Sequence, residues 1–376
     1  MITVAILPAP MSGCAAYRLF FPLLELQRRG EIKLLCSIAY HAPDGQTRLQ
    51  PVGNLPFDVI EKASGYGQFA LSDEDIETAD VVVLQKSGGL KTGAENESGL
   101  LETVERLGRR KFVYEVDDDL ESITKLNPCY IEELQHNPGF IARMRALASR
   151  CRLVTCTTSY LANRMTKINP EVRVVPNGVD LDAWRPEGWT RPTADGRRLR
   201  CGWLASRNHV EDAQLLVRPL KRIAAKFPDV TFVLGGGFFP CLKDALGDRL
   251  EYHGGVSMTE YPAFARSLRL DIGLAPLADS VFARSKSALR WIEYTAMGIP
   301  TVASDVEPYR QAIGLVDRAG WLVNSTGDWI EALAHAITDA SARVAAVDAS
   351  DQLVRKWYTV QFAADRWLEV IREVVS

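Results

Sequence analysis

Short apolar runs rich in β-branched residues alternate with longer amphipathic stretches along this chain of 376 residues. In the first half, the runs that read as buried strands are Thr3–Leu7, Lys33–Ile38, Val81–Leu84, Phe112–Val116, Leu153–Cys156 and Val172–Val175. Continuous apolar strands between helices are typical of a parallel sheet that helices cover on both faces. The pattern therefore predicts an α/β fold, in which ligands bind at the carboxyl ends of the strands.

The pattern restarts in the second half of the chain. The strand candidates there are Leu199–Leu204, Val230–Leu234, Leu250–His253, Ile272–Ala275 and Thr301–Ala303. Trp184–Gly196 precedes them and is rich in proline, glycine and polar residues, as inter-domain connections are. We predict two Rossmann-like domains facing a cleft. Their limits are an N-terminal domain over 1–180, a linker over 181–198, a C-terminal domain over 199–355, and a C-terminal helix over 356–376 that crosses back to the N-terminal domain.

Charge and cysteine content narrow the class of protein. The net charge of −3 does not indicate a globally basic nucleic-acid-binding protein, although a local basic groove stays open. The seven cysteines are scattered without zinc spacing, which fits reduced thiols in a cytoplasm. Met1–Leu7 has no basic leader and reads as a first strand, and no apolar run approaches the roughly 20 residues that cross a bilayer. We expect a cytoplasmic protein with no transmembrane segment; a membrane-surface role stays open.

The segment Phe282–Asp305 reads as a loop, a helix start, an amphipathic helix and a short buried strand. Ser285, Lys286 and Ser287 lie where this helix is expected to begin. Backbone N–H groups and the positive end of the helix dipole favour an anion there. Glu293 lies two turns further along, where it could suit a ribose hydroxyl. This is the layout of a nucleotide site; the alternative is a buried amphipathic helix with an ordinary cap.

An acidic cluster, Glu115–Asp119, ends the expected strand Phe112–Val116. Adjacent carboxylates repel each other, so we expect the pKa of at least one to be raised. Asp117 or Asp118 could act as a general base or orient a substrate, or the cluster could bind a divalent metal. A solvated cap for the following turn is the third interpretation.

Two glycine-containing turns and one histidine are further candidates. Gly235–Gly237 ends a strand and could let a phosphate approach the backbone, or it could be a flexible turn. In the loop before the first helix, Gly13 would allow close approach and Arg18 could pair with phosphate; the alternative is a plain strand–helix turn. His209 could touch a phosphate or a sugar, or cap the helix that follows it.

Several motifs occur in the order and spacing of one known family. They are Thr155–Ala162, Val174–Asp180, Gly202–Leu204, Val230–Gly236, His253–Val256, Asp271–Leu277 and Lys286–Pro300. Together they resemble GT-B fold glycosyltransferases of the family-4, or group 1, type. The Tyr17–Arg18 and Asp117–Asp119 signatures are also similar to those of glycosyltransferase-like proteins of bacteriophages. The resemblance is strongest over roughly residues 150 to 310.

The resemblance implies roles for individual residues. Glu293 matches the second glutamate of the family's Glu-x7-Glu motif, which binds the donor ribose, while Ser285 stands where the first would be and Asp279 is near. Gly255 and Val256 match the loop that contacts the base, and Trp203 replaces a family arginine. The expected catalytic residues are Asp117, Asp118, Lys286 and Arg207. The expected nucleotide-sugar ligands are Gly13, Arg18, Gly236, Gly255, Val256, Asp279, Ser285, Ser287, Arg290 and Glu293, and the expected acceptor-side residues are Tyr17, Asp119 and His209.

The resemblance implies transfer of a sugar from a nucleoside-diphosphate donor, a UDP-sugar above all, to a hydroxyl acceptor with retention of configuration. No metal or other cofactor is expected, and domain closure would limit hydrolysis of the donor. The acceptor is either a hydroxymethylated base in phage-type DNA or a glycan, lipid or small molecule. The basic runs Arg106–Lys111, Arg143–Arg152 and Arg197–Arg200 are solvated faces or hold a phosphate-bearing acceptor. The alternatives are a nucleotide-sugar or glycan-binding protein without activity, and a phosphorylase or epimerase.

Overall fold

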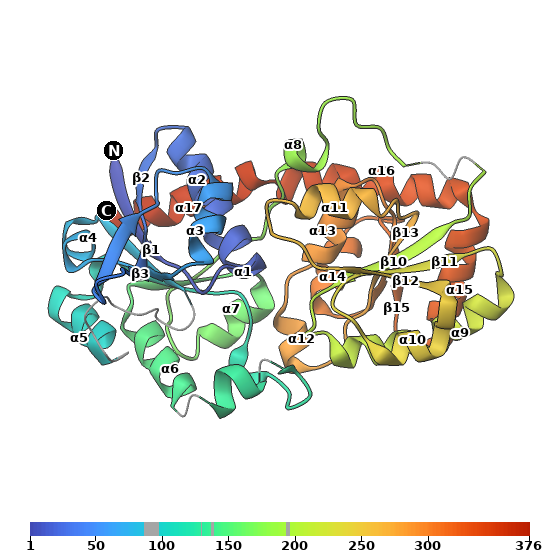
Figure 1. Ribbon diagram of the computed structural model, residues 1–376, viewed down its shortest axis with the longest axis horizontal. Coiled ribbons are helices and arrows are strands. Elements are labelled where there is room, and N and C mark those ends of the chain that lie inside the picture. Colours follow the sequence, from blue (N-terminus) through green and yellow to red (C-terminus); the bar gives the residue numbers. More distant parts are fainter. Residues whose placement is uncertain (86–97, 129, 137–138, 193–195) are drawn as a thin grey trace. The chain divides into compact units, whose positions relative to one another are not determined.

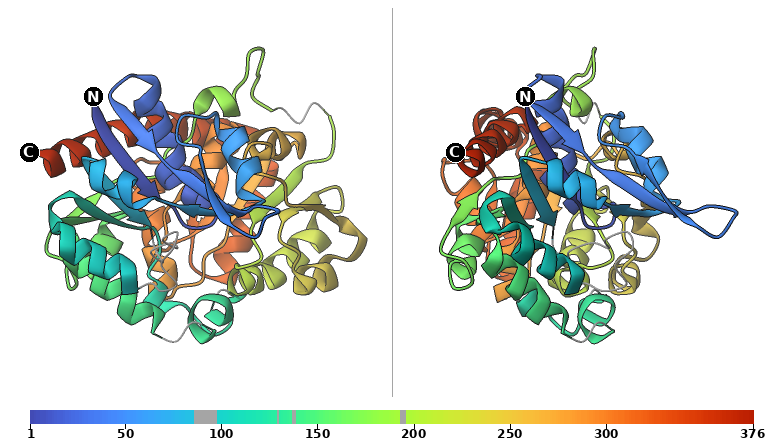
Figure 2. Two further views of the ribbon diagram at one scale, coloured as in Figure 1. Left: turned by 60° about the vertical axis from the view of Figure 1, so that its left-hand side comes forward. Right: turned by 90° about the vertical axis from the view of Figure 1, so that its left-hand side faces the viewer.

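The computed structural model describes residues 1–376 except 86–97, 129, 137–138 and 193–195. The chain divides into two compact units (Figure 1). The first unit holds residues 1–120, 137–178 and 360–376, and the second holds 121–136 and 179–359. Both termini therefore lie in the first unit (Figure 2). Part of the expected linker, 193–195, lies outside the described residues.

The first unit is built on a parallel sheet with the order β2-β1-β6-β7-β8-β9. Its strands are β1 (Ile2–Leu7), β2 (Ile32–Leu35), β6 (Val81–Gln85), β7 (Phe112–Val116), β8 (Leu153–Cys156) and β9 (Val172–Val174). A small antiparallel sheet is formed by β3 (Ser37–His41), β4 (Thr47–Pro51) and β5 (Gln68–Ala70). The expected strand Lys33–Ile38 is thus divided between two sheets, and the β3–β4 hairpin extends away from the large sheet (Figure 2).

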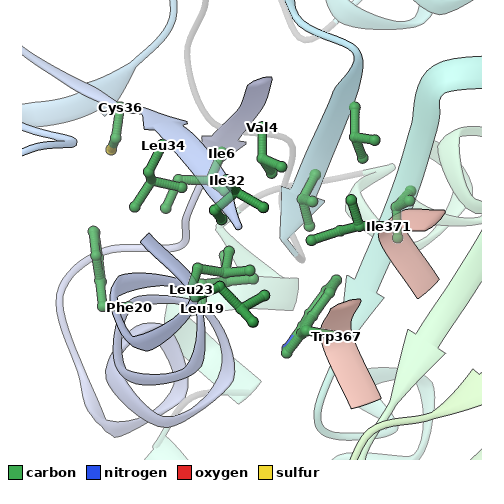
Figure 3. Packing of buried hydrophobic residues seen from close by; sticks show 14 of the residues in the cluster. Val4, Ile6, Leu19, Phe20, Leu23, Ile32, Leu34, Cys36, Trp367 and Ile371 are labelled. Carbon is green, nitrogen blue, oxygen red and sulfur yellow. The ribbon is translucent and has the colours of Figure 1, made fainter. Parts of the chain in front are cut away.

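Helices cover the first sheet. They are α1 (Gly13–Ala15), α2 (Phe21–Arg28), α3 (Phe57–Ser64), α4 (Asp73–Thr78), α5 (Ser98–Leu107), α6 (Phe140–Arg150), α7 (Ser159–Met165) and α17 (Val360–Val375), with a π-helical turn η1 (Ala16–Phe20) between α1 and α2. Figure 3 shows Trp367 and Ile371 of α17 packing with Leu19 and Leu23 in the core beneath the sheet. Buried side chains recur every three or four residues along α17, so one apolar face of this helix completes the core.

The second unit has a parallel sheet with the order β12-β11-β10-β13-β14-β15. Its strands are β10 (Arg200–Ala205), β11 (Thr231–Gly236), β12 (Leu250–Gly254), β13 (Ile272–Ala275), β14 (Thr301–Ser304) and β15 (Trp321–Val323). The strand order reverses between β10 and β13, and such a reversal is where Rossmann-like sheets bind ligands. The predicted fold class, α/β with two Rossmann-like parallel sheets, is confirmed.

The helices of the second unit are α8 (Leu181–Trp184), α9 (Val210–Lys226), α10 (Pro240–Leu246), α11 (Tyr261–Ser267), α12 (Val281–Ser285), α13 (Leu289–Ala296), α14 (Glu307–Ile313), α15 (Thr326–Thr338) and α16 (Ala340–Trp357). The segment expected as a loop before residue 285 is a short helix, α12, and the helix expected to begin at residues 285–287 begins at Leu289, because Lys286 is extended (ψ 166°) between α12 and α13. Glu293 therefore lies one turn, not two, inside its helix. Among the described residues, no helix is both long and apolar enough to cross a membrane.

Candidate functional site

The carboxylate of Asp212 joins two loops at the point where the second sheet reverses its strand order. Asp212 lies in the first turn of α9 and is almost fully buried. Its Oδ1 accepts a hydrogen bond from the backbone N–H of Ala278, in the loop after β13, at 2.6 Å. Its Oδ2 lies 2.6 Å from Nδ1 of His209, in the loop after β10. One buried carboxylate thus fixes the carboxyl ends of β10 and β13 relative to each other.

The imidazole of His209 is held on two sides. Asp212 engages Nδ1, and the ring of Trp203 lies edge-on to the imidazole with centroids 6.0 Å apart. Trp203 itself stacks on Phe239 at 4.9 Å, so its position is set by the core. With Nδ1 bound by a carboxylate, Nε2 is the ring nitrogen that can face a ligand. His209, expected on the acceptor side, thus lies in the second unit, on the same loop as Arg207.

The glycines that end β11 are required by the neighbouring main chain. Gly236 has a φ of +97°, and a Cβ there would lie 2.4 Å from the carbonyl oxygen of Ala205. Gly237 donates its N–H to the same carbonyl at 2.6 Å, and a Cβ on Gly237 would lie 2.7 Å from the nitrogen of Arg207. These glycines thus allow the backbone after β11 to approach the backbone after β10 closely, and this contact supports the loop that carries Arg207. The predicted approach of a phosphate to the same glycines stays a prediction.

Glu293 of α13 is almost fully buried and engaged by two side chains. Its Oε2 accepts a hydrogen bond from the hydroxyl of Tyr261 at 3.2 Å and forms an ion pair with Arg290, which also contacts that hydroxyl. Burial raises the pKa of Tyr261 far above its usual value, so this hydroxyl keeps its proton. The guanidinium of Arg290 neutralises Glu293, and its predicted role as a cation for the diphosphate stays a prediction. The role of Glu293 at the ribose stays a prediction.

The residues expected at the helix start are distributed differently. Ser285 is buried, and its hydroxyl donates to the carbonyl of Val281 within α12, so it faces away from the start of α13. Lys286 lies over the ring of Phe282, with Nζ 4.3 Å from the centroid. Lys286 and Ser287 are half-buried and precede the first amides of α13, which have no intrahelical partner by helix geometry. Among the three residues predicted to form the anion site, Lys286 and Ser287 therefore lie where they could contact an anion at the start of α13.

Asp279 does not replace the missing glutamate in this geometry. Both of its carboxylate oxygens are bound by Arg284, at 2.6 and 2.8 Å, on the surface. The hydrogen bond from Arg284 holds the pKa of Asp279 below its usual value. Gly255 and Val256 are exposed in the loop after β12, and Arg207 is exposed in the loop after β10. These positions are compatible with their predicted contacts, which stay predictions.

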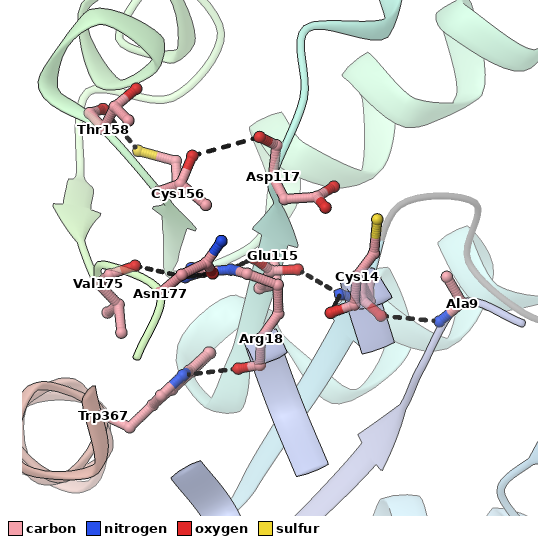
Figure 4. A network of polar contacts seen from close by, with 12 residues as sticks. Ala9, Cys14, Arg18, Glu115, Asp117, Cys156, Thr158, Val175, Asn177 and Trp367 are labelled. Atoms are coloured by element: carbon pink, nitrogen blue, oxygen red, sulfur yellow. Dashed lines mark hydrogen bonds and ion pairs between the residues drawn. The ribbon is translucent and has the colours of Figure 1, made fainter. Parts of the chain in front are cut away.

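In the first unit, Arg18 is the centre of a buried network (Figure 4). It is 1% exposed, and its Nε donates to Oε1 of Glu115 at 2.7 Å. Its Nη1 donates to the carbonyl of Val175 and to Oδ1 of Asn177, and Trp367 donates to its backbone carbonyl. The buried turn η1 directs this side chain inward, onto Glu115, and pairing of Arg18 with a phosphate stays a prediction.

The remaining oxygen of Glu115 is bound by the amide of Gln85 at 2.8 Å, and Gln85 also accepts the backbone N–H of Ala9 at 3.0 Å. Burial raises the pKa of the Glu115 carboxyl above its usual value even though Arg18 opposes the shift, and the charge of Asp117 raises it further. The expected raised pKa in the acidic cluster is thus found at Glu115, with burial rather than its neighbours as the main cause. The network links the loop after β1 to the carboxyl ends of β6 and β7.

Other predicted residues of the first unit differ in exposure. Tyr17 is buried edge-on against Phe21, with centroids 5.3 Å apart, whereas Gly13 is half-buried. Asp119 is buried and forms an ion pair with Arg164 of α7, so its carboxylate holds that helix. Asp117 is buried too, and its carbonyl accepts a hydrogen bond from Thr157. Asp118 is the most exposed of the three aspartates.

Most of the basic side chains in the three runs serve structural contacts. Lys111 donates to the carbonyls of Ile76, Glu77 and Ala79 at the end of α4, where the helix dipole favours a cation. Ion pairs in these runs include Arg106–Glu77, Arg150–Glu105, Arg197–Asp271 and Arg200–Glu251. This pairing argues against their use for a phosphate-bearing acceptor.

A contact that sequence reasoning missed brings residues 121–136 into the second unit. Thr124 donates its hydroxyl to Oε2 of Glu211, in the first turn of α9, at 2.6 Å. The chain thus enters the second unit after Leu120, contacts the first turn of α9 at Glu211, and returns to the first unit before α6. Among the described residues, no group of three or more His, Cys, Asp or Glu side chains could hold a metal ion.

Comparisons with known proteins agree with this architecture. Residues 198–342 match the family described as Glycosyl transferases group 1. No curated protein matches the chain in sequence.

Among solved structures, sucrose-phosphate synthase of Thermosynechococcus elongatus is similar over 99% of this chain and 98% of its own, with a TM-score of 0.62 and 14% identity. A UDP-forming α,α-trehalose-phosphate synthase of Burkholderia xenovorans covers 100% of both chains, with a TM-score of 0.61 and 12% identity. Anabaena HepE, solved in complex with UDP and glucose, covers 99% of both, with a TM-score of 0.60 and 14% identity. At these identities the likeness establishes the fold.

Proposed function

We propose that this chain, which carries a group 1 glycosyl transferase domain in a GT-B fold, moves a sugar from a UDP-sugar to a hydroxyl acceptor. The observation that carries the proposal is the arrangement at the strand reversal of that domain, where Asp212 fixes His209 and the loop of Ala278. The complexes of HepE with UDP support the choice of donor. No cofactor is required in this proposal.

The donor's diphosphate would lie at the carboxyl ends of β10 and β13. His209, Arg207 and Lys286 supply hydrogen bonds and positive charge there, and the first amides of α13 add to them. Glu293 would bind the ribose, and the Gly255–Val256 loop would contact the base. The negative charge that develops on the departing diphosphate is what these donors stabilise.

We propose that transfer retains configuration. The bond between the anomeric carbon and the diphosphate oxygen breaks as the acceptor oxygen bonds to the same face of that carbon, and the acceptor proton passes to the departing phosphate. Asp118, the most exposed carboxylate of its cluster, orients the acceptor hydroxyl. The ion pairing of the basic runs and the net charge of −3 favour a glycan, lipid or small-molecule acceptor over duplex DNA. The phage-type resemblance stays a prediction.

The test is release of nucleoside diphosphate from UDP-, GDP- and ADP-sugars, measured with and without duplex DNA that contains hydroxymethylcytosine. Slow release from a UDP-sugar that glycan or lipid acceptors stimulate supports the proposal. If the modified DNA stimulates the release of nucleoside diphosphate, the acceptor is a DNA base and not a glycan, lipid or small molecule. No release from any donor would contradict a transferase.

A binding protein without turnover is the second candidate, and Ser285 favours it. This residue stands at the position of the family's first glutamate, yet it is buried and bonded to Val281. Tight binding of UDP with no transfer to any acceptor would identify this alternative.

Replacing Glu293 by glutamine should weaken UDP binding about 10- to 100-fold, because a charge-assisted hydrogen bond to the ribose is lost. Titration calorimetry measures the change. The matched control is Asp351→Asn, which alters another carboxylate of this unit that is paired with two arginines, Arg185 and Arg355. This control should lower stability and leave UDP affinity unchanged. If the wild type and Glu293→Gln bind UDP with equal affinity, Glu293 does not bind the donor.

A further inference from the structure

Two aromatic side chains lie exposed next to each other at the carboxyl edge of the second sheet. Phe238, in the turn after β11, is 46% exposed, and Tyr252 of β12 is 45% exposed. Their ring centroids are 5.0 Å apart with an interplanar angle of 69°. Neighbouring exposed aromatic rings are a common sign of a binding site, because each keeps a large apolar surface in water.

The ring of Tyr252 and the backbone that carries Phe238 are held in place. The hydroxyl of Tyr252 donates to the carbonyl of Gly236 at 3.0 Å, and Tyr252 pairs with Leu234 of β11 in the parallel register. Phe239, which follows Phe238, stacks on Trp203 in the core. A fixed ring loses little conformational entropy when a flat ligand stacks on it, so this pair is preorganised.

The position of the pair matches one part of a nucleoside diphosphate. Phe238 follows the end of β11, and Tyr252 lies two residues before the end of β12, on the same edge as His209. A Cβ on Gly255 would lie 3.9 Å from Cα of Gly236, the residue whose carbonyl Tyr252 binds. When the phosphates lie at the strand reversal, the nucleoside can extend along either of the two halves of this edge. In the described residues of the β13–β15 half, no aromatic side chain is exposed at that edge.

We propose that Phe238 and Tyr252 form the platform on which the base of the donor nucleotide stacks. The inference rests on the proposed function and adds to it the residues that hold the base. The base stacks on one ring while the other meets its edge, and the hydroxyl of Tyr252 serves only to hold the ring through Gly236.

Titration calorimetry with two ligands tests the platform. One ligand is whichever of UDP, GDP and ADP binds the wild type most tightly, and the other is ribose 5-diphosphate, which lacks the base. Phe238→Ala and Tyr252→Ala should weaken nucleotide binding about 10- to 100-fold and change ribose 5-diphosphate binding less than about twofold. Tyr252→Phe keeps the ring and should bind the nucleotide nearly as wild type does. The control Trp357→Ala removes another exposed aromatic side chain of this unit and should change neither affinity.

Unchanged nucleotide affinity in both alanine variants would overturn the inference. An equal loss for both ligands would overturn it as well, because it would show a general disturbance of the edge. If the alanine variants show a higher KM for the acceptor and an unchanged affinity for the nucleotide, the two rings bind an acceptor sugar and not the base. If the wild type binds none of the three nucleotides, the proposed function itself fails, and the platform with it.

Discussion

Replacing Arg18 by methionine should destabilise the protein by about 3–5 kcal/mol, the cost of leaving a buried carboxylate without its cation. Arg18 is 1% exposed, and its partner Glu115 is fully buried. Methionine keeps much of the apolar volume, so the lost ion pair and hydrogen bonds dominate the effect. Urea unfolding followed by circular dichroism measures the change.

The deficit of this variant should shrink as the pH falls. Burial holds the pKa of Glu115 above its usual value already in the wild type, and removing Arg18 removes the main opposing influence. A carboxyl whose folded pKa is raised binds a proton more tightly in the folded state, so stability falls as the pH rises from the unfolded pKa, about 4.5, to the folded one. In Arg18→Met this window extends to higher pH. We expect the difference from wild type to be larger at pH 7.5 than at pH 5.

Two variants make the result interpretable. Arg28→Met breaks a surface ion pair with Glu25, in which the arginine is 72% exposed, and should cost at most about 1 kcal/mol. The double variant Arg18→Met/Glu115→Leu removes both buried charges and should recover part of the lost stability. A double variant no more stable than Arg18→Met would show that packing, not the unpaired carboxylate, explains the loss.

The sheets could be predicted from the sequence because buried parallel strands leave continuous apolar runs. β7 and β8 match the expected ranges, and the strands of the second sheet fall within one or two residues of theirs. β15 (Trp321–Val323) was not predicted, because its three residues contain a single β-branched side chain, whereas the equally short β9 contains two valines. Helix α12 was missed, and the start of α13 was placed two to four residues too early, because Lys286 and Ser287 do not oppose a helix by themselves. Ser280, which caps α12 by accepting the N–H of Ala283, is the signal that could have located the earlier start.

The site could be predicted only in part, because its contacts join residues far apart in the chain. The spacing of His209 and Asp212 puts them within reach across one helical turn, but the bond from Asp212 to Ala278 spans 66 residues. Tyr261 meets Glu293 across 32 residues, and Arg18 meets Glu115 across 97. From the sequence alone, Arg18 could be expected to bind some anion, because it lies between a strand and a helix. Only the tertiary structure shows that the buried carboxylate of Glu115 is an anion that it binds.

Replacing His209 by alanine should lower kcat/KM for sugar transfer about 100- to 1,000-fold. In the proposed function both ring nitrogens of His209 carry a proton, so that Nδ1 donates to the Asp212 carboxylate and Nε2 donates to the departing diphosphate. One preorganised donor to a developing charge has an effect of this size. Asp212→Asn should give a smaller loss, because asparagine keeps an oxygen for Ala278 but no longer holds Nδ1 of His209 as a carboxylate does. Steady-state kinetics with the active UDP-sugar and its acceptor measures both.

The control for His209 is the other histidine–aspartate pair of this unit. His335 and Asp339 lie 3.4 Å apart on α15 and just after it, and both are exposed. His335→Ala should leave kcat/KM within about twofold of wild type. His209→Ala should also keep the wild-type unfolding midpoint to within a few degrees, because its side chain is partly exposed and only its Asp212 and Trp203 contacts are lost. Full activity in a folded His209→Ala protein would exclude His209 from the stabilisation of the departing diphosphate, and Lys286 and Arg207 would then be the remaining candidates for the cation that the reaction needs.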